Sequence, residues 1–231
     1  LVFTNLTPEH LPSHGTFENY RRTKQKIFAE LGRSNRKIIN GRGIPKAVIA
    51  NIDSPEAYNF LKFPADKKLT YGTSAKADMR IEKAKDGTRG VAFTANGLNV
   101  RINIPGVFNA GNALPSLLIG DLLGLDKSKL IAGLESLKTV PGRMEIVQRE
   151  PFLIIVDYAH EKESMTLALR ACKSFLQKKG KLIVLLGAEG GGRDKAKRPV
   201  MGRIAAQLAD FVVVSNVDPY TDDPTEIINN I

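Results

Sequence analysis

The chain has 231 residues, of which 42% are hydrophobic and 25% are charged, as in an ordinary globular protein. It has no run of about 18 apolar residues, which excludes a membrane-spanning helix, and a single cysteine, Cys172, which excludes a disulfide framework. Its 34 Lys and Arg against 24 Asp and Glu leave a formal charge of +10, which favours an anionic partner such as nucleic acid, a nucleotide or an acidic substrate. Because the sequence opens on Leu1 in a strand-like run, with no signal peptide, we expect a fragment.

The first part of the chain predicts short strands mixed with helices. Strands are expected at 1–6, 47–51, 69–71, 79–83, 91–94 and 98–104, and helices at 16–31, 54–60, 108–123 and 126–137. Residues 79–104 are expected to form an antiparallel meander, with turns at Asp86-Gly87 and Asn96-Gly97. Pro115 lies inside a predicted helix and is expected to kink it.

The pattern changes after Pro141-Gly142, which we interpret as a border between a domain of residues 1–140 and a second of 141–231. Strands at 152–156, 182–186 and 211–215 alternate with helices at 165–176 and 201–208. This alternation is typical of parallel βαβ units, so the fold class is α/β. Because such sheets bind ligands at the carboxyl ends of their strands, chemistry is expected in the polar segments 157–160, 187–194 and 216–223.

Two groups of candidate residues lie in the first domain. His10 and His14 are four residues apart, but Pro12 argues against one continuous helix, and a solvated loop is favoured about two to one over a metal site. Asn109 and Asn112 stand at a helix start. There an asparagine commonly caps the helix, although its amide can also read a purine edge.

Two further groups lie in the second domain. Asp157 and His160 follow a strand, where the carboxylate can bond ribose hydroxyls or hold a metal, or cap the next helix with about equal probability. The glycine-rich segment 187–194 lets the backbone approach an anion, and Arg193 adds a clamp for a carboxylate or phosphate. It is neither a Walker A loop nor a GxGxxG fingerprint. The basic residues behind it, Lys195, Lys197 and Arg198, are expected to form a solvated face.

Read in order, these segments resemble the Mur ligase family, and in particular its members that add the third residue of the peptidoglycan stem peptide. The matching runs are Thr4-Asn5-Leu6, His10 to Gly15 with Glu18-Asn19-Tyr20 and Lys24, Gly106 to Pro115, Val140 to Glu145, Val156 to Met165, and Gly190 to Met201. The resemblance covers essentially the whole chain. It implies that the chain contains the second half of the family's central ATPase domain, with a mixed sheet and helices, followed by the first half of a Rossmann-like C-terminal domain.

The resemblance also implies a reaction, cofactors and partners. ATP phosphorylates a carboxylate of UDP-N-acetylmuramoyl-dipeptide, the amine of a free amino acid attacks the acyl phosphate, and phosphate leaves. ATP and Mg²⁺ would be the cofactors. The protein would be a cytoplasmic, monomeric enzyme of cell-wall synthesis, and it would bind neither nucleic acid nor membrane.

By the same resemblance, His10 would bind the second magnesium and Lys24 would be a carbamylated metal ligand, both in the catalytic centre. Residues at the nucleotide would be Asn109, Asn112, Arg143, Asp157 and His160, with the two asparagines at the adenine and Asp157 on the ribose. Arg193 would meet a carboxylate of the incoming amino acid.

Several positions depart from the family pattern. Pro12 replaces an Asp, Glu161-Lys162-Glu163 replaces Thr-Pro-Asp, and the glycine loop has one extra residue. The "DNPR" run that reads diaminopimelate is Val217 to Tyr220, with Asp218 for Asn and Tyr220 for Arg. Because an uncompensated carboxylate at Asp218 favours a cationic side chain, we expect a lysine-like acceptor rather than diaminopimelate.

No Gly-Lys-Thr/Ser P-loop occurs in these 231 residues, so we expect no ligation by this polypeptide alone, and low stability from incomplete sheet edges. The alternatives are a related ligase of the folylpolyglutamate or cyanophycin synthetase type, or a basic nucleic-acid-binding α/β module. The second is suggested only by the charge, since Trp is absent and aromatic residues are 6%. A homologue that keeps the motifs without activity is a third alternative.

Overall fold

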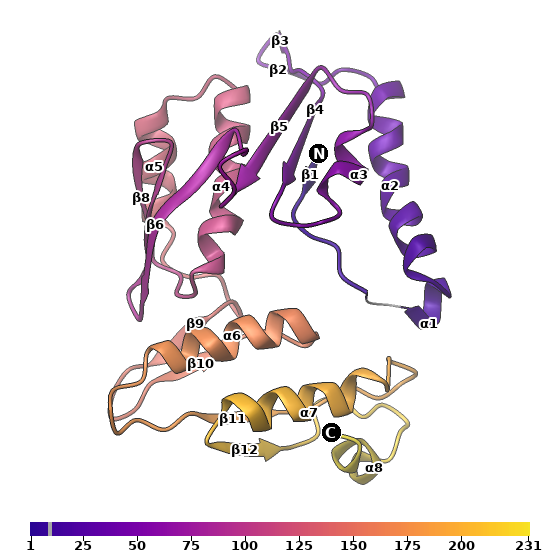
Figure 1. Ribbon diagram of the computed structural model, residues 1–231, viewed down its shortest axis with the longest axis vertical. Coiled ribbons are helices and arrows are strands. Elements are labelled where there is room, and N and C mark those ends of the chain that lie inside the picture. Colours follow the sequence, from indigo (N-terminus) through magenta and orange to yellow (C-terminus); the bar gives the residue numbers. More distant parts are fainter. Residues whose placement is uncertain (9–10) are drawn as a thin grey trace. The chain divides into compact units, whose positions relative to one another are not determined.

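The computed structural model describes residues 1–8 and 11–231. It divides into two compact units, Leu1–Thr139 and Val140–Ile231 (Figure 1). The α/β class expected from the sequence is confirmed in both.

The first unit is built on a six-stranded sheet in the order β1-β4-β5-β6-β7-β8. Its strands are β1 (Val2–Phe3), β4 (Ala47–Asn51), β5 (Lys67–Gly72), β6 (Met79–Gly87), β7 (Gly90–Ala95) and β8 (Leu98–Ile102). A separate hairpin pairs β2 (Ile38–Ile39) with β3 (Arg42–Gly43). The helices are α1 (Leu11–His14), α2 (Phe17–Arg33), α3 (Ala57–Leu61), α4 (Phe108–Leu122) and α5 (Lys127–Ser136).

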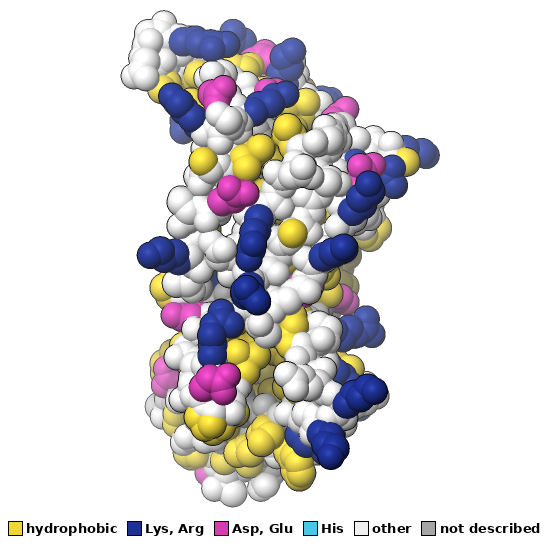
Figure 2. Space-filling model, turned by 90° about the vertical axis from the view of Figure 1, so that its left-hand side faces the viewer, with side chains coloured by type: hydrophobic (Ala, Val, Ile, Leu, Met, Phe, Trp, Pro, Cys, Tyr) yellow, Lys and Arg dark blue, Asp and Glu magenta, His cyan; other side chains and the backbone are white. Residues whose placement is uncertain are grey.

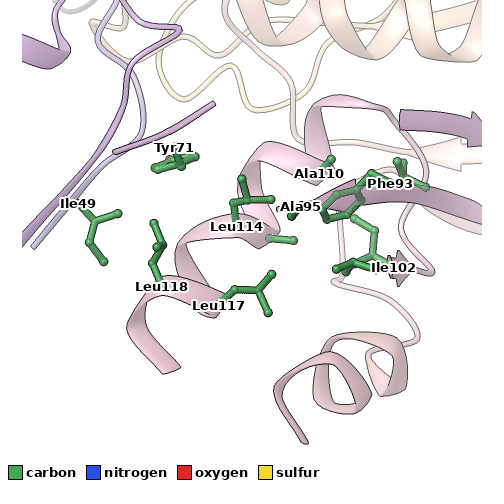
Figure 3. Packing of buried hydrophobic residues seen from close by; sticks show 12 residues of the cluster. Ile49, Tyr71, Phe93, Ala95, Ile102, Ala110, Leu114, Leu117 and Leu118 are labelled. Atoms are coloured by element: carbon green, nitrogen blue, oxygen red, sulfur yellow. The ribbon is translucent and has the colours of Figure 1, made fainter. Parts of the chain in front are cut away.

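Strand β4, second from the β1 edge of the sheet, is apolar on both of its faces. Val48 and Ala50 pack with side chains of α2 and α3 in one cluster. Ile49 points to the other face and packs in a second cluster with Tyr71 and Leu114 of α4 (Figure 3). Since alternate residues of a strand face opposite sides, α2 and α4 cover opposite faces of the sheet.

The meander of β6, β7 and β8 has the antiparallel pairing expected from the sequence. Its second turn is also as expected, with Asn96 and Gly97 both at positive φ, as a two-residue hairpin loop favours. The first turn was misplaced: β6 continues through Gly87, and the chain reverses at Thr88-Arg89. The reason lies in Asp86, whose carboxylate does not form the turn but accepts N–H groups from the start of α4.

The second unit contains two short sheets. β9 (Glu145–Gln148) pairs antiparallel with β10 (Ile154–Val156), and β11 (Ile183–Leu186) pairs parallel with β12 (Phe211–Val214). The helices are α6 (Lys162–Ser174), α7 (Lys197–Leu208) and α8 (Pro224–Asn229). Met165 and Leu169 of α6 pack against Met201 and Ile204 of α7 in the core of the unit.

The sequence predicted the parallel β11–β12 pair and its crossover helix, but it missed β9 and α8. It also placed 152–156 among the parallel strands, whereas β10 forms its ladder with β9. No helix in the described parts of the chain is long and apolar enough to cross a membrane.

Candidate functional site

In the first unit, the candidate residues stand where elements begin. Thr16 caps α2, because its hydroxyl accepts the N–H of Asn19 at 3.1 Å. Lys24 is exposed on α2, with Nζ 5.4 Å from the ring centroid of Tyr20. The Tyr20 ring in turn contacts His14, at 5.0 Å between centroids. His10 lies outside the described residues, so its predicted meeting with Lys24 stays a prediction.

The two asparagines do not cap α4. Its N-cap position is Val107, and the cap is supplied across the fold by Asp86, whose carboxylate accepts the N–H groups of Gly106 and Val107 at 3.0 Å each. Asn109 is buried and donates to the carbonyl of Pro105 at 2.6 Å, while its Oδ1 accepts the amide of Asn112 at 2.8 Å. The buried residue therefore orients the exposed one.

Lys24 and this asparagine pair lie on elements that cover opposite faces of the sheet. The start of α2, where α1 is labelled, and the start of α4 both lie toward the carboxyl ends of β4 and β5 (Figure 1). A ligand at that edge of the sheet can be approached from both faces, as is usual for parallel strands.

In the second unit, two loops join around Asp157. Its two carboxylate oxygens accept the N–H groups of Met144 at 2.7 Å and Ala159 at 2.8 Å. Tyr158 returns the link by donating its N–H to the carbonyl of Gly142 at 2.8 Å. Residues 142–144, before β9, and 157–159, after β10, thus form one hydrogen-bonded platform at the open end of the β9–β10 hairpin.

The Tyr158 ring organises the side chains on this platform. The guanidinium carbon of Arg143 lies 5.4 Å from the ring centroid, within cation–π range. The His160 ring meets the same tyrosine edge-on at 5.1 Å, and His160 Nδ1 lies 2.8 Å from the Tyr158 carbonyl. The structure therefore brings Arg143 together with Asp157 and His160.

A second cluster lies on the loops that follow β11 and β12. Arg193 Nε lies 3.4 Å from a carboxylate oxygen of Glu189. A hydrogen bond with the Tyr220 side chain raises the pKa of Arg193 above its ordinary value, with smaller electrostatic contributions from Glu189, Tyr220 and Tyr158.

Asp218 and Tyr220 contribute differently. The Asp218 carbonyl accepts the N–H of Gly190 at 2.9 Å, which ties the two loops together, while its side chain is exposed. Tyr220 holds positive φ, an unusual conformation for a bulky residue and one often found at functional loops.

The prediction of a solvated basic face behind the glycine loop is wrong in part. Arg198 is only 1% exposed, and the side chain of Lys197 is 16% exposed, with Nζ 3.2 Å from Glu161. Glu161 also caps α6. Charged runs are usually solvated, so no sequence signal marked Arg198 as buried or Lys197 as half-buried. Their acidic partners, Asp222 and Glu161, lie far away in the chain.

The residues that the structure describes contain no group of three or more His, Cys, Asp or Glu that could hold a metal ion. Each carboxylate oxygen of Asp157 already accepts one N–H and keeps a lone pair that can accept a hydrogen bond from a hydroxyl group.

Comparison with known proteins follows this division of the chain. The family model described as "Mur ligase middle domain" matches residues 1–120, and that described as "Mur ligase, glutamate ligase domain" matches residues 142–231. A UDP-N-acetylmuramoyl-L-alanyl-D-glutamate–2,6-diaminopimelate ligase of Clostridium acetobutylicum is 39% identical over 237 residues. The enzyme of that name from Bacillus velezensis is 36% identical over 235 residues.

Both alignments cover 100% of this chain but 46% of the relative, so the chain spans about half the length of these relatives. A solved ligase structure of the same name is 28% identical, with a TM-score of 0.61 over 99% of this chain and 46% of that one. The MurF ligase of Thermotoga maritima in complex with ADP is 21% identical, with a TM-score of 0.71 over 98% of this chain and 50% of the other, which supports the fold.

Proposed function

Because the chain belongs to the Mur ligase family, we propose that it carries the nucleotide-binding and amino-acid-binding parts of an ATP-dependent amide ligase of peptidoglycan synthesis. The proposed reaction joins a carboxylate of UDP-N-acetylmuramoyl-L-alanyl-D-glutamate to an amino acid. ATP transfers its γ-phosphoryl group to the carboxylate, giving ADP and an acyl phosphate. The amine of the amino acid attacks the carbonyl carbon of the acyl phosphate, loses a proton and expels phosphate.

The observation that carries this proposal is the joining of loops around Asp157. Two backbone N–H groups fix the carboxylate in place before any ligand arrives. A preorganised acceptor of this kind suits the ribose hydroxyls of ATP, with Arg143 available for the phosphates and His160 beside it. We place Asn112 at the adenine, oriented by Asn109.

Lys24 and His10 are proposed as the catalytic pair at the metal. Carbamylation would turn the Lys24 ammonium into an anionic group that suits a hard cation such as Mg²⁺. When bound, magnesium would neutralise charge on the transferring phosphoryl group. Lys24 is exposed, so CO₂ can reach its Nζ.

Arg193 is proposed to bind a carboxylate of the incoming amino acid. Relatives up to 39% identical are named for diaminopimelate, and this does not support the lysine-like acceptor that Asp218 and Tyr220 suggested. The Tyr220 hydroxyl is itself a hydrogen-bond donor, so the change from Arg to Tyr does not remove every donor for a second carboxylate. We therefore propose diaminopimelate as the acceptor to test first.

The test is amino-acid-dependent release of ADP by the gene product that carries this chain, with UDP-N-acetylmuramoyl-dipeptide as substrate and mass spectrometry of the amide product. We expect diaminopimelate to exceed lysine and ornithine in kcat/KM. Faster turnover of lysine would restore the lysine-like acceptor, whereas ADP release independent of any amino acid would reject the ligase.

Point variants test whether Asp157 binds the nucleotide. Asp157→Asn should raise the KM for ATP because a neutral amide is a weaker acceptor for hydroxyls. Glu163→Gln, on exposed α6 surface, is the matched control and should leave that KM unchanged. An equal rise in both variants would contradict the assignment of Asp157.

A further inference from the structure

Arg198 is the feature of the second unit that the proposed function leaves unexplained. It lies in the first turn of α7, and its side chain is among the largest that are fully buried in the protein. An arginine keeps its charge in proteins, and burying that charge is unfavourable unless it is paired. A role on the surface is therefore excluded, and its partners indicate what it does.

The partners of Arg198 come from two different loops. Its Nη2 donates to the carbonyl of Glu189, in the glycine loop after β11, at 2.9 Å. The same nitrogen lies 3.6 Å from Oδ2 of Asp222, in the loop after β12. Lys195, which is exposed, also faces Asp222 at 3.9 Å. The buried Arg198 side chain thus connects the two loops.

These two loops carry Arg193 and Tyr220. Glu189 stands four residues before Arg193, and Asp222 stands two residues after Tyr220. A small displacement of Glu189 or Asp222 is therefore passed along only two to four residues of backbone, to Arg193 or to Tyr220, at the proposed amino-acid subsite.

The loops also pack too closely to absorb such a displacement. A Cβ on Gly190 would lie 2.1 Å from the Pro219 carbonyl oxygen, and one on Gly191 would lie 2.8 Å from the Tyr220 side chain. The Gly190 N–H bonds the Asp218 carbonyl in the same region. Backbone lies against backbone, so the two loops move together or clash.

The charge pair is not fully hydrogen-bonded. Among the described residues, Nε and Nη1 of Arg198 and Oδ2 of Asp222 have no hydrogen-bond partner. The guanidinium therefore has donors to spare for Asp222, while its Nη2 stays anchored on the Glu189 carbonyl.

We propose that Arg198 is a positioning residue, which sets the spacing between Arg193 and Tyr220 through the Glu189 carbonyl and Asp222, and thereby sets the affinity for the incoming amino acid. This inference rests on the proposed function, because it assumes that Arg193 and Tyr220 form the amino-acid subsite.

The test uses the gene product that carries this chain, with Arg198→Lys and Asp222→Asn as the main variants. Lysine keeps the charge but cannot span two partners as a planar guanidinium does. We expect each variant to raise the KM for the amino acid about tenfold, while the KM for ATP and for the nucleotide-sugar substrate changes less than about twofold. Arg203→Lys, on the exposed side of the same helix, is the matched control and should behave as wild type.

The double variant distinguishes positioning from general damage. If Arg198 acts through Asp222, the double variant should raise the amino-acid KM no more than the worse single variant, since the two changes break one connection. Direct binding of the amino acid, measured by calorimetry, should weaken in parallel. Thermal unfolding of each variant establishes that it is folded, and Asp222→Asn serves if Arg198→Lys does not fold.

Three results would overturn the inference: an unchanged amino-acid KM in a folded variant, an equal change in all three KM values, or strictly additive effects in the double variant. The failure of the proposed function looks different, because then wild type itself shows no amino-acid-dependent ADP release.

Discussion

The two units treat apolar strands differently. In the first unit, β4 buries Val48, Ile49 and Ala50 to 2% exposure or less, because helices cover both faces of the sheet. In the second unit, β11 and β12 alternate: Val184 and Val212 pack toward the helices, whereas the opposite face is open. That open face consists of Ile183, Leu185, Phe211 and Val213, which are 49–69% exposed.

The sequence hides this difference. Both regions read as continuous apolar runs, residues 47–50 and 183–186, and such runs are typical of strands buried on both sides. The two regions differ in the helices that pack on them: helices cover both faces of β4 but one face of β11 and β12. The comparison teaches that an apolar run predicts a strand and its burial potential, while tertiary packing decides whether that potential is realised.

The largest expected effect is on the covered core. Leu114 of α4 is fully buried, so Leu114→Ala should lower the free energy of unfolding by about 2–5 kcal/mol, from lost contacts and the cavity left behind. Leu185→Ala, at 69% exposure, should change it by less than about 0.5 kcal/mol. Urea unfolding of both variants measures this, and similar losses would show that the open face contributes as much as the covered one.

A second test uses alkaline pH. Burial, and to a lesser degree the Asp53 carboxylate, raises the pKa of Tyr71 from 10.0 to about 12. Since the folded pKa exceeds the unfolded one, the associated stability is present below about pH 10 and lost as pH rises through 12. The loss should be on the order of 2 kcal/mol.

Tyr71→Phe should abolish that part of the pH dependence, while Tyr58→Phe, at 64% exposure, should preserve it. Urea unfolding at about pH 9 and pH 11.5 measures the difference. Parallel pH profiles for wild type and Tyr71→Phe would contradict the predicted coupling.

The smallest expected effect concerns how helices are capped. Asp86 caps α4 from a strand, whereas Glu161 caps α6 locally. Asp86→Ala should destabilise the first unit by about 1–2 kcal/mol, because two N–H groups lose their acceptor. The matched control is Asp121→Ala, because Asp121 is exposed on α4. Asp78→Ala does not serve as the control, since the Asp78 carboxylate accepts hydrogen bonds from Thr70. Equal losses in both variants would argue against a specific cap.

Much of this fold could be predicted from the sequence, because its signals are local. β4 matches its predicted bounds, α2 and α5 lie where helices were predicted, and the Asn96-Gly97 turn forms where predicted. β9 was missed because four residues carry too little pattern, and β10 was assigned to the wrong sheet because strand pairing is not local.

The candidate site divides in the same way. Motif residues such as Asp157 could be found, since they follow strands. Arg198 could not, because only Asp222 and the Glu189 carbonyl, brought close by folding, distinguish it from an exposed basic residue such as Lys195. On the surface shown in Figure 2, Lys and Arg side chains are spread among Asp and Glu rather than gathered in one stripe, so net charge alone also gave little guidance.

The carboxylate in front of α4 has one more consequence. The first turn of a helix normally attracts negative groups through its partial positive charge. In this protein an internal anion, Asp86, already neutralises that end. A triphosphate gains nothing by approaching it and is repelled at short range, so a nucleotide lying against this helix is expected to present its uncharged base to Asn112 and to direct its phosphates elsewhere.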